Sequence, residues 1–267
     1  MRIGVIIPAA GSSARYAAAG GLRSKLDEDL GGKPVLQRTV ELFTKFEPRE
    51  GTIGAIIVAG PGNPDDFAEF RARHGDRLGF LGATLVPGGI THRWETVRAA
   101  LGAVPDDCTH VCVHDAARPC ASPELIDRVL RAGAMYPGVI PAVGITDTVK
   151  RVRDTGEAMG EDDPTAAILG AAPSRPLRVV EQTVDRAGLG LVQTPQFFRA
   201  DLLRRAYAQA DLSSTDDAGL VERLGERVVV VEGEARNIKV TVPDDLALAR
   251  LILGVRPPEG RPVHKRF

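Results

Sequence analysis

Short apolar runs of strand length alternate along this chain with stretches in which apolar residues recur at helical spacing. The runs cover residues 3–7, 53–59, 83–86, 110–113, 139–143, 189–193 and 228–231. Because each run is apolar at consecutive positions, we expect both faces of each strand to be covered by other parts of the chain. Strands that alternate with helices in this way predict an α/β fold, with a mostly parallel sheet between two layers of helices.

The stretches between the runs carry the apolar stripes of amphipathic helices. These stripes begin near Val35, Val97, Leu125, Leu202 and Leu248. Open parallel sheets bind their ligands where the strands end, at the carboxyl edge of the sheet. We therefore expect the chemistry of this protein in the loops that directly follow strands.

The composition argues against several classes of partner. The chain has 267 residues, of which 43% are apolar and 26% are charged, and its formal net charge is −1. This balance gives no basic footprint for nucleic acid or for an anionic membrane. No run approaches the length of a membrane span, and no secretory leader is recognisable. The odd number of cysteines (Cys108, Cys112 and Cys120) favours free thiols in a reducing compartment, so we expect a cytoplasmic protein.

The alternation is interrupted between about residues 144 and 188. The stretches DTVKRVRD and PLRVVEQTVDR are typical of two solvated strands, and a polar stretch rich in proline and glycine, residues 154–175, separates them. Two strands alone bury little surface, so we expect a projecting β-arm that needs a partner surface, for which a second copy of the chain is the natural candidate. Residues 1–255 are predicted to form a single domain that includes this dimerisation arm, and residues 256–267 are typical of a disordered tail.

The loop after the first apolar run has the composition of a phosphate-binding site. It consists of residues that shield their backbone amides little, namely Pro8, Ala9, Ala10, Gly11, Ser12 and Ser13. Successive amides of such a loop can form an anion-binding nest, and Arg15 and Lys25 follow as two cations suited to phosphate. The loop has neither the dinucleotide fingerprint nor the ending of a P-loop. The alternative interpretation is a tight turn with ordinary surface cations.

A series of further motifs follows this loop in a fixed order. After PAAGSSAR and Lys25 come VHDAARP (113–119), TDTVKR (146–151), TVDR (183–186), LVQTPQFF (191–198), STDDA (214–218) and NIKVTVPDDLALA (237–249). Together these segments closely resemble the 2-C-methyl-D-erythritol 4-phosphate cytidylyltransferase family of the non-mevalonate isoprenoid pathway. The resemblance covers nearly the whole chain except the tip of the arm and the tail.

The resemblance implies a homodimeric, Rossmann-like nucleotidyltransferase with a three-layer α/β fold and a projecting β-arm. It implies transfer of CMP from CTP to methylerythritol phosphate, with Mg²⁺ or another divalent cation as cofactor, whose ligands in this chain stay unassigned. The phosphate of the substrate is already an anion at neutral pH, so it can attack the α-phosphorus of CTP without a general base. Positioning and charge neutralisation then supply most of the catalysis.

The resemblance also assigns residues to three roles. The catalytic group comprises Arg15, Lys25 and Lys239. The CTP-binding group comprises Pro8, Ala9, Ala10, Gly11, Ser12, Ser13, Gly88, Gly89 and Thr96. The group that binds the polyol phosphate comprises Asp115, Arg118, Thr148 and Arg186. Each group has a structural alternative: a plain strand-to-helix turn at the glycines, an internal Asp–Arg pair, and ordinary solvated charges on the arm.

Four features depart from the family pattern. Ser13 replaces the second glycine of the loop, and Ile90 stands where an acid usually follows the glycine pair. The segment from Arg15 to Lys25 is longer than typical and lacks a proline before the lysine. The arm carries an insertion over about residues 156–175.

Three other functions are alternatives at this stage. The first is a cytidylyltransferase for another polyol phosphate, such as ribitol 5-phosphate. The second is an NAD(P)-dependent oxidoreductase, but the stretch VAGPGNPDD (58–66) supplies neither the glycine fingerprint nor the ribose-binding acid cleanly. The third is a nucleotide-binding regulator without turnover. Release of pyrophosphate from CTP distinguishes these possibilities.

Overall fold

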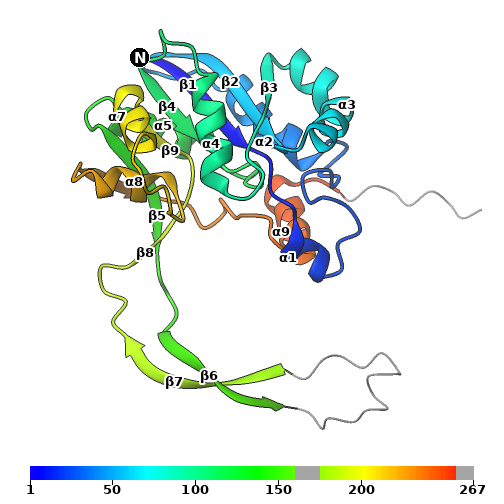
Figure 1. The fold of residues 1–267 in the computed structure, drawn as a ribbon, viewed down its shortest axis with the longest axis vertical. Helices are drawn as coiled ribbons and strands as arrows, with labels where there is room; N and C mark the ends of the chain where they lie inside the picture. Colours follow the sequence, from blue (N-terminus) through cyan, green and yellow to red (C-terminus); the bar gives the residue numbers. More distant parts are fainter. Residues whose placement is uncertain (160–174, 257–267) are drawn as a thin grey trace, which may run out of the picture. The chain divides into compact units, whose positions relative to one another are not determined.

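A mixed, mostly parallel sheet forms the centre of the larger of two compact units (Figure 1). The strand order is β10-β5-β9-β4-β1-β2-β3. The strands are β1 (Arg2–Pro8), β2 (Thr52–Gly60), β3 (Ala83–Pro87), β4 (His110–Val113), β5 (Gly138–Gly144), β9 (Gln196–Arg199) and β10 (Val228–Glu232). Neighbouring strands are parallel except β9, which is antiparallel to both β4 and β5. The predicted α/β class is confirmed, and all seven predicted strands begin and end within one residue of their expected bounds.

The computed structural model describes residues 1–159 and 175–256. The chain forms two compact units, which are described separately: a main unit of Met1–Val143 with Val192–Phe267, and a hairpin unit of Gly144–Leu191. Most of the predicted tail and most of the predicted arm insertion fall outside the described residues. Within those residues, no helix combines the length and the apolar character needed to cross a membrane.

Helices pack on both faces of the sheet, which makes the main unit three layers thick. The helices are α1 (Ala14–Ala18), α2 (Val35–Thr44), α3 (Pro64–Phe80), α4 (Arg93–Gly102), α5 (Pro123–Gly133), α7 (Ala200–Tyr207), α8 (Asp217–Arg223) and α9 (Pro243–Leu253). On one face, Val5 packs in a cluster with residues of α2, α3, α5 and α9. On the other, Ile6 packs with residues of α4, α7 and α8. Consecutive apolar residues of β1 therefore enter opposite layers, as the continuous run predicts.

Three elements, β8 (Gly190–Val192), β9 and α3, differ from the sequence-based prediction. The run at 189–193 forms only β8, whose residues are exposed, so the expectation that both of its faces are covered is wrong. The buried strand is β9, where Phe197 and Phe198 enter opposite core clusters. Helix α3 was not predicted, because only Phe70, His74 and Leu78 are buried along its charged surface. Three buried positions four residues apart make too narrow a stripe to recognise.

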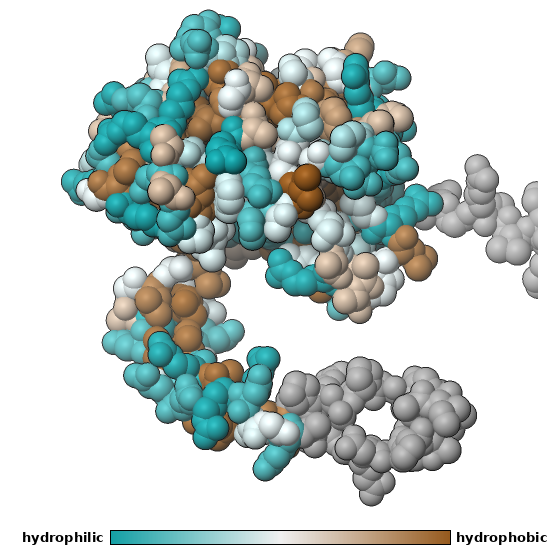
Figure 2. Space-filling model, viewed as in Figure 1, coloured by the Kyte–Doolittle hydropathy of each residue, from teal (hydrophilic) through white to brown (hydrophobic). Residues whose placement is uncertain are grey.

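The hairpin unit contains the predicted pair of antiparallel strands. They are β6 (Val149–Met159) and β7 (Arg175–Val184), and Val149 pairs with Val184 at their open end. Apolar side chains including Val152, Val179 and Val180 are exposed on these strands. Figure 2 shows such apolar patches among the polar side chains of the hairpin. A two-stranded ribbon leaves these groups in contact with water unless another surface covers them.

The central position of β9 gives a prediction about stability. Phe197 is fully buried and its ring stacks against His110 with a centroid distance of 5.2 Å. Phe197→Ala is expected to lower the free energy of unfolding by about 3–5 kcal/mol, because it leaves a cavity in the core. Phe80→Ala is the matched control, since Phe80 is 93% exposed, and it should change stability by roughly 0.5 kcal/mol or less. Urea denaturation checks both, and equal losses would contradict the assignment of β9 to the core.

Candidate active site

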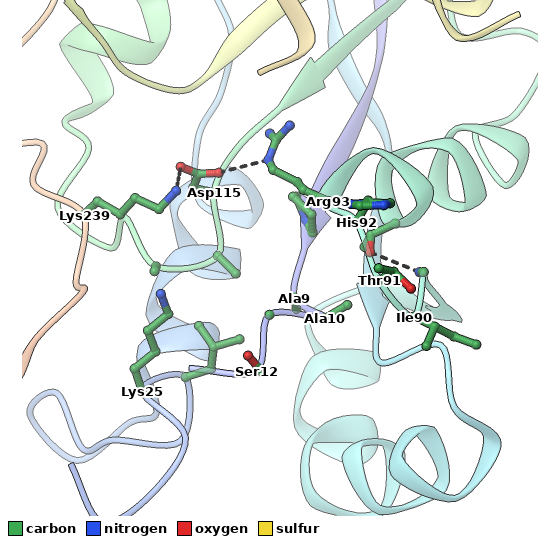
Figure 3. A pocket seen from close by; sticks show the side chains of 17 residues that line it. Ala9, Ala10, Ser12, Lys25, Ile90, Thr91, His92, Arg93, Asp115 and Lys239 are labelled. Atoms are coloured by element: carbon green, nitrogen blue, oxygen red, sulfur yellow. Dashed lines mark hydrogen bonds and ion pairs between the residues drawn. The ribbon is translucent and has the colours of Figure 1, made fainter. Parts of the chain in front are cut away.

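A cavity of about 320 Å³ lies where strands β1, β3 and β4 end, which is a volume typical of small-molecule sites. Its walls come from segments far apart in the sequence (Figure 3). The lining residues are Pro8, Ala9, Ala10, Gly11, Ser12, Lys25, Leu26, Gly89, Ile90, Thr91, His92, Arg93, Thr96, Asp115, Ala116, Ala117 and Lys239. The cavity thus occupies the carboxyl edge of the sheet, where the alternation of strands and helices predicts a ligand site.

The loop after β1 presents its backbone to this cavity. The amide of Ala9 is used by the fold and donates to the carbonyl of Ala59, at 2.7 Å. No described residue accepts a hydrogen bond from the amides of Ala10, Gly11 or Ser12. A Cβ on Gly11 would meet no atom within 4 Å, so packing does not require a glycine there. The small residue instead leaves the amides open to an anion.

The glycine pair after β3 is explained differently. A Cβ on Gly88 would lie 2.5 Å from the carbonyl oxygen of Gly60, and one on Gly89 would lie 2.2 Å from the Cβ of Glu95. The buried Thr96 accepts a hydrogen bond from the amide of Gly89 through Oγ1, at 3.0 Å. Packing against neighbouring segments therefore requires these glycines. Gly89 and Thr96 line the cavity, whereas Gly88 does not.

Glu95 fixes the segment that follows the glycine pair, residues 90–92, which continues this wall of the cavity. Its Oε2 accepts hydrogen bonds from the amides of Ile90, Thr91 and His92, at 3.0, 2.9 and 3.2 Å. The side chain of Ile90 is 80% exposed. This position therefore offers a ligand only an apolar group, and the backbone amides beside it are already bound.

Asp115 is the electrostatic centre of the cavity. Its Oδ2 lies 2.8 Å from the Nζ of Lys239 and 3.4 Å from the Nε of Arg118, and its Oδ1 lies 3.7 Å from the Nε of Arg93. Burial alone would raise the pKa of this carboxyl, but the charges of Lys239 and Arg93 outweigh it and hold the pKa well below its usual range. The Asp115 amide also donates to Oγ1 of Thr194, at 3.0 Å. Asp115 is therefore a fixed carboxylate that draws three cations together.

Arg93 belongs to the site, although the sequence analysis assigned it no role. Its Nη2 lies 2.8 Å from Oδ2 of Asp217, which is fully buried and also accepts a hydrogen bond from the hydroxyl of Tyr207, at 2.5 Å. Burial opposes the charge of Arg93, but Asp217 and Asp115 raise its pKa overall. One feature of the sequence could have indicated a partner for a buried cation such as Arg93, namely the second acid of the STDDA motif. Asp216 caps α8, so Asp217 is not needed for the cap and can pair with a cation elsewhere.

Lys25 enters the cavity from the opposite side. Figure 3 shows its amino group directed towards the space below Asp115 and Lys239. Burial lowers the pKa of Lys25, and the charges of Lys239 and Arg15 lower it further. An anion that approached Lys25 would raise this pKa. Ser13, which has a positive φ of 55°, places its Oγ 3.4 Å from the amide of Lys25.

The structure brings together only part of the predicted site. Lys25, Lys239, Asp115 and most of the loop after β1 line one cavity, but Arg15, Ser13 and Arg118 do not. Arg15 is exposed on α1. Arg118 points inward and donates through Nη1 to the carbonyl of Asn237, at 2.7 Å. Arg118 also forms the internal pair with Asp115 that is the structural alternative for this residue, and its assignment to substrate binding stays a prediction.

The two predicted arm residues belong to the hairpin unit. Thr148 directly precedes β6, and Arg186 follows β7, where its guanidinium donates to the carbonyl of Thr146. Their assignment to substrate binding stays a prediction.

The residues of the cavity fit a divalent cation that is bound together with a polyphosphate. Within the described part of the chain, no group of three or more His, Cys, Asp or Glu side chains could hold a metal ion. Among the described lining residues Asp115 is the one carboxylate, and Lys239 and Arg93 already match its charge. Mg²⁺ keeps several waters and accepts phosphate oxygens as ligands. A divalent ion therefore fits here as part of a metal–polyphosphate ligand, without a cage of protein side chains.

Comparison with known proteins identifies the family. The model of the family described as 2-C-methyl-D-erythritol 4-phosphate cytidylyltransferase (IspD) matches residues 3–167 and 166–255. The chain belongs to the IspD family. The enzyme of that description from Frankia casuarinae is 42% identical over 253 residues, which cover 94% of this chain and 81% of the relative. The one from Rhodococcus jostii is 40% identical over 251 residues, or 93% of each chain.

A solved structure of the IspD family supports the same assignment. The crystal structure of 2-C-methyl-D-erythritol 4-phosphate cytidylyltransferase from Thermus thermophilus is 32% identical in sequence to this chain. The match has a TM-score of 0.67 and covers 96% of this chain and all of the other. The likeness therefore includes the main unit and the hairpin unit of this IspD-family protein.

The open side of Gly11 gives a prediction about anion binding. Gly11→Ala is expected to weaken the binding of inorganic triphosphate about tenfold, because the added Cβ projects into the space that the anion must enter and costs roughly one hydrogen bond. Gly102→Ala, at the end of α4, is the matched control, since its Cβ also meets nothing within 4 Å. Isothermal titration calorimetry checks both variants. Equal affinities for the two variants would show that the loop does not hold the anion.

Proposed function

We propose that this IspD-family protein transfers CMP from CTP to 2-C-methyl-D-erythritol 4-phosphate. The products are 4-diphosphocytidyl-2-C-methyl-D-erythritol and pyrophosphate. The observation that carries the proposal is a single cavity in which open backbone amides face Lys25, Arg93 and Lys239, with Asp115 as the paired carboxylate. This excess of positive charge suits a triphosphate that must approach a second phosphate.

The reaction forms one bond and breaks one bond at phosphorus. An oxygen of the substrate's phosphate bonds to the α-phosphorus of CTP, and the bond from this phosphorus to the bridging oxygen breaks. Pyrophosphate leaves with the electron pair of the broken bond. The attacking phosphate is already ionised at neutral pH, so no side chain has to remove a proton from it. The protein therefore accelerates the reaction by positioning and by neutralising charge.

The loop after β1 and the two lysines have different roles in positioning and charge neutralisation. The amides of Ala10, Gly11 and Ser12 bind phosphate oxygens of CTP. Lys25 neutralises the charge that develops on the α-phosphate and on the leaving pyrophosphate. Lys239 acts from the opposite wall, where its bond to Asp115 fixes its position.

Mg²⁺, or another divalent cation, accompanies CTP as a counter-ion of the triphosphate. When bound, it supplies charge neutralisation on the phosphate oxygens. The residues of the main unit bind and orient the nucleotide around it.

Arg15 and Arg118 act less directly in this proposal. Arg15 contributes positive charge from the rim of the site, since its charge acts on the pKa of Lys25 although its side chain does not line the cavity. Arg118 acts by holding Asp115, which faces the hydroxyl groups of the polyol. Both assignments require that Asp115 and Lys25 contact the substrates.

The hairpin unit is proposed as a dimerisation arm within a single domain of residues 1–255. Thr148 and Arg186 then bind the phosphate of methylerythritol phosphate in the site of the partner subunit. Two observations support this: the match of the TDTVKR and TVDR motifs, and the exposed apolar side chains of Val152 and Val180, which a partner would cover.

The proposed location is the cytoplasm. All three cysteines are free thiols, and all three are buried. Free thiols persist in reducing compartments, which supports this location.

A pyrophosphate-release assay tests the proposed function. The protein with CTP and Mg²⁺ is expected to release pyrophosphate when methylerythritol phosphate is added, and not with ribitol 5-phosphate. ATP, UTP and GTP serve as nucleotide controls and should give little release. Turnover with ribitol 5-phosphate in place of methylerythritol phosphate would favour the other polyol. No release with either would indicate a nucleotide-binding protein without turnover.

The lowered pKa of Lys25 gives a prediction about pH. Only the protonated amine binds phosphate, so kcat/KM for CTP is expected to fall as the pH rises through the pKa of Lys25, which lies below the ordinary value of 10.5. Lys25→Arg should remove this alkaline loss because a guanidinium stays charged there. Lys33→Arg is the control, since Lys33 is bound to Glu41 away from the cavity. An unchanged alkaline limb in Lys25→Arg would contradict the role of Lys25.

A further inference from the structure

A cluster of side chains ties the segment that carries Lys25 to helix α3. Lys25 lies in the stretch between α1 and α2, which has no strand or helix of its own. Two residues later, Oδ1 of Asp27 lies 2.7 Å from Nε2 of His74, and Oδ2 lies 2.5 Å from Nη1 of Arg73. One carboxylate thus joins this irregular segment to two consecutive residues of a long helix.

Helix α3 is a rigid support for this contact. His74 is only 3% exposed and its ring lies 4.9 Å from that of Phe70, which belongs to the core cluster. The helix begins at a cap in which the side chain of Asn63 accepts hydrogen bonds from the amides of Asp65 and Asp66. The histidine cannot follow Asp27 if the segment moves, because it is packed among residues of the core.

The contact is a pair of charged hydrogen bonds. Burial would raise the pKa of Asp27, but the hydrogen bond with His74 and the nearby charge of Arg73 lower it overall. Asp27 is therefore ionised at neutral pH. Charge-assisted bonds of this kind are about twice as strong as neutral ones.

The residue between Lys25 and Asp27 is also fixed. Leu26 is 5% exposed, packs in the core, and accepts a hydrogen bond from the amide of Leu36 through its carbonyl, at 3.1 Å. Neighbouring Cα atoms are only about 3.8 Å apart. Leu26 and Asp27 therefore together hold the short stretch of main chain that carries Lys25.

We propose that His74 and Arg73 are positioning residues, which hold Lys25 at the wall of the cavity by fastening Asp27 to α3. Neither these two side chains nor Asp27 lines the cavity with Lys25; they line a neighbouring one that shares the loop after β1. Their effect on catalysis passes through Lys25. The inference rests on the proposed function, in which Lys25 neutralises phosphate charge.

A double-mutant cycle on kcat tests the inference. Lys25→Ala alone is expected to lower kcat about a hundredfold, the loss typical of removing one charge-stabilising group. Asp27→Asn alone should lower kcat about tenfold, because a displacement of less than about 1 Å already costs much of the rate. In the Lys25→Ala background, Asp27→Asn should have almost no further effect. Losses that multiply in the double variant would overturn the inference, since Asp27 would then act independently of Lys25.

Three matched variants separate positioning from general damage. Asp76→Asn removes an exposed acid from the same helix and should leave kcat unchanged. His74→Gln keeps a nitrogen donor near the position of Nε2 and should retain most of the activity, whereas His74→Phe keeps the bulk and loses the donor. The inference predicts a loss of about tenfold for His74→Phe, the scale of Asp27→Asn. Equal activity in the two His74 variants would contradict it.

A second measurement follows Lys25 without using turnover. The chain has six lysines, so reductive methylation with ¹³C-formaldehyde gives few NMR signals to assign. The charged groups that act on Lys25 are Lys239, Arg15, Asp115 and Asp245. In Asp27→Asn the amine should become less buried and should titrate at higher pH than in the unchanged protein. An unchanged titration would overturn the inference even if the enzyme is active. If the unchanged protein releases no pyrophosphate, the proposed function fails, and this titration still decides whether Asp27 holds Lys25.

Discussion

The active cavity depends on one buried carboxylate, Asp115, at the end of β4. Lys239 from the C-terminal part of the chain, Arg93 from the start of α4 and Arg118 from the same loop all direct their charges at it. Three cations this close would repel one another in a partly buried site if no anion stood between them. Asp115 lets the fold collect positive charge at the edge of the sheet before any phosphate arrives. The surplus that remains, including Lys25, is available to a ligand.

The backbone around the cavity is specialised in two ways. The glycines after β3 are required by packing, because added Cβ atoms would strike Gly60 and Glu95. Gly11, in the loop after β1, is free of such contacts, and the amides beside it have no partner among the described residues. The loop after β3 is therefore fixed by packing and forms a rigid wall of the cavity. The loop after β1 instead leaves its backbone amides open to a ligand. A triphosphate needs both, since it must be bound by amides and kept in one position.

Much of this arrangement could be predicted from the sequence, because parallel strands bring their carboxyl ends to one edge. The loop after β1, Asp115 and Lys25 follow from that rule and from the motifs around them. The pairing of Arg93 with Asp217 could not be predicted, because the two residues are 124 positions apart and meet only when the fold brings the first residue of α4 to the first residue of α8. Strand β9 was missed for a similar reason. Its four residues are too short to show a period, and their place between β4 and β5 is decided by tertiary pairing. Arg15 and Arg118 stood beside Lys25 in the predicted site because sequence alone does not show which way a side chain points. Arg118 is bonded inward to the carbonyl of Asn237, whereas the amine of Lys25 is directed into the cavity.

The most direct test of the central claim is a crystal structure of the protein soaked with CTP and Mg²⁺. The account predicts triphosphate density against the amides of Gly11 and Ser12, with Lys25 and Lys239 in contact with its oxygens and the bond between Lys239 and Asp115 retained. Triphosphate density in the neighbouring cavity beside Asp27, or away from the loop after β1, would contradict it.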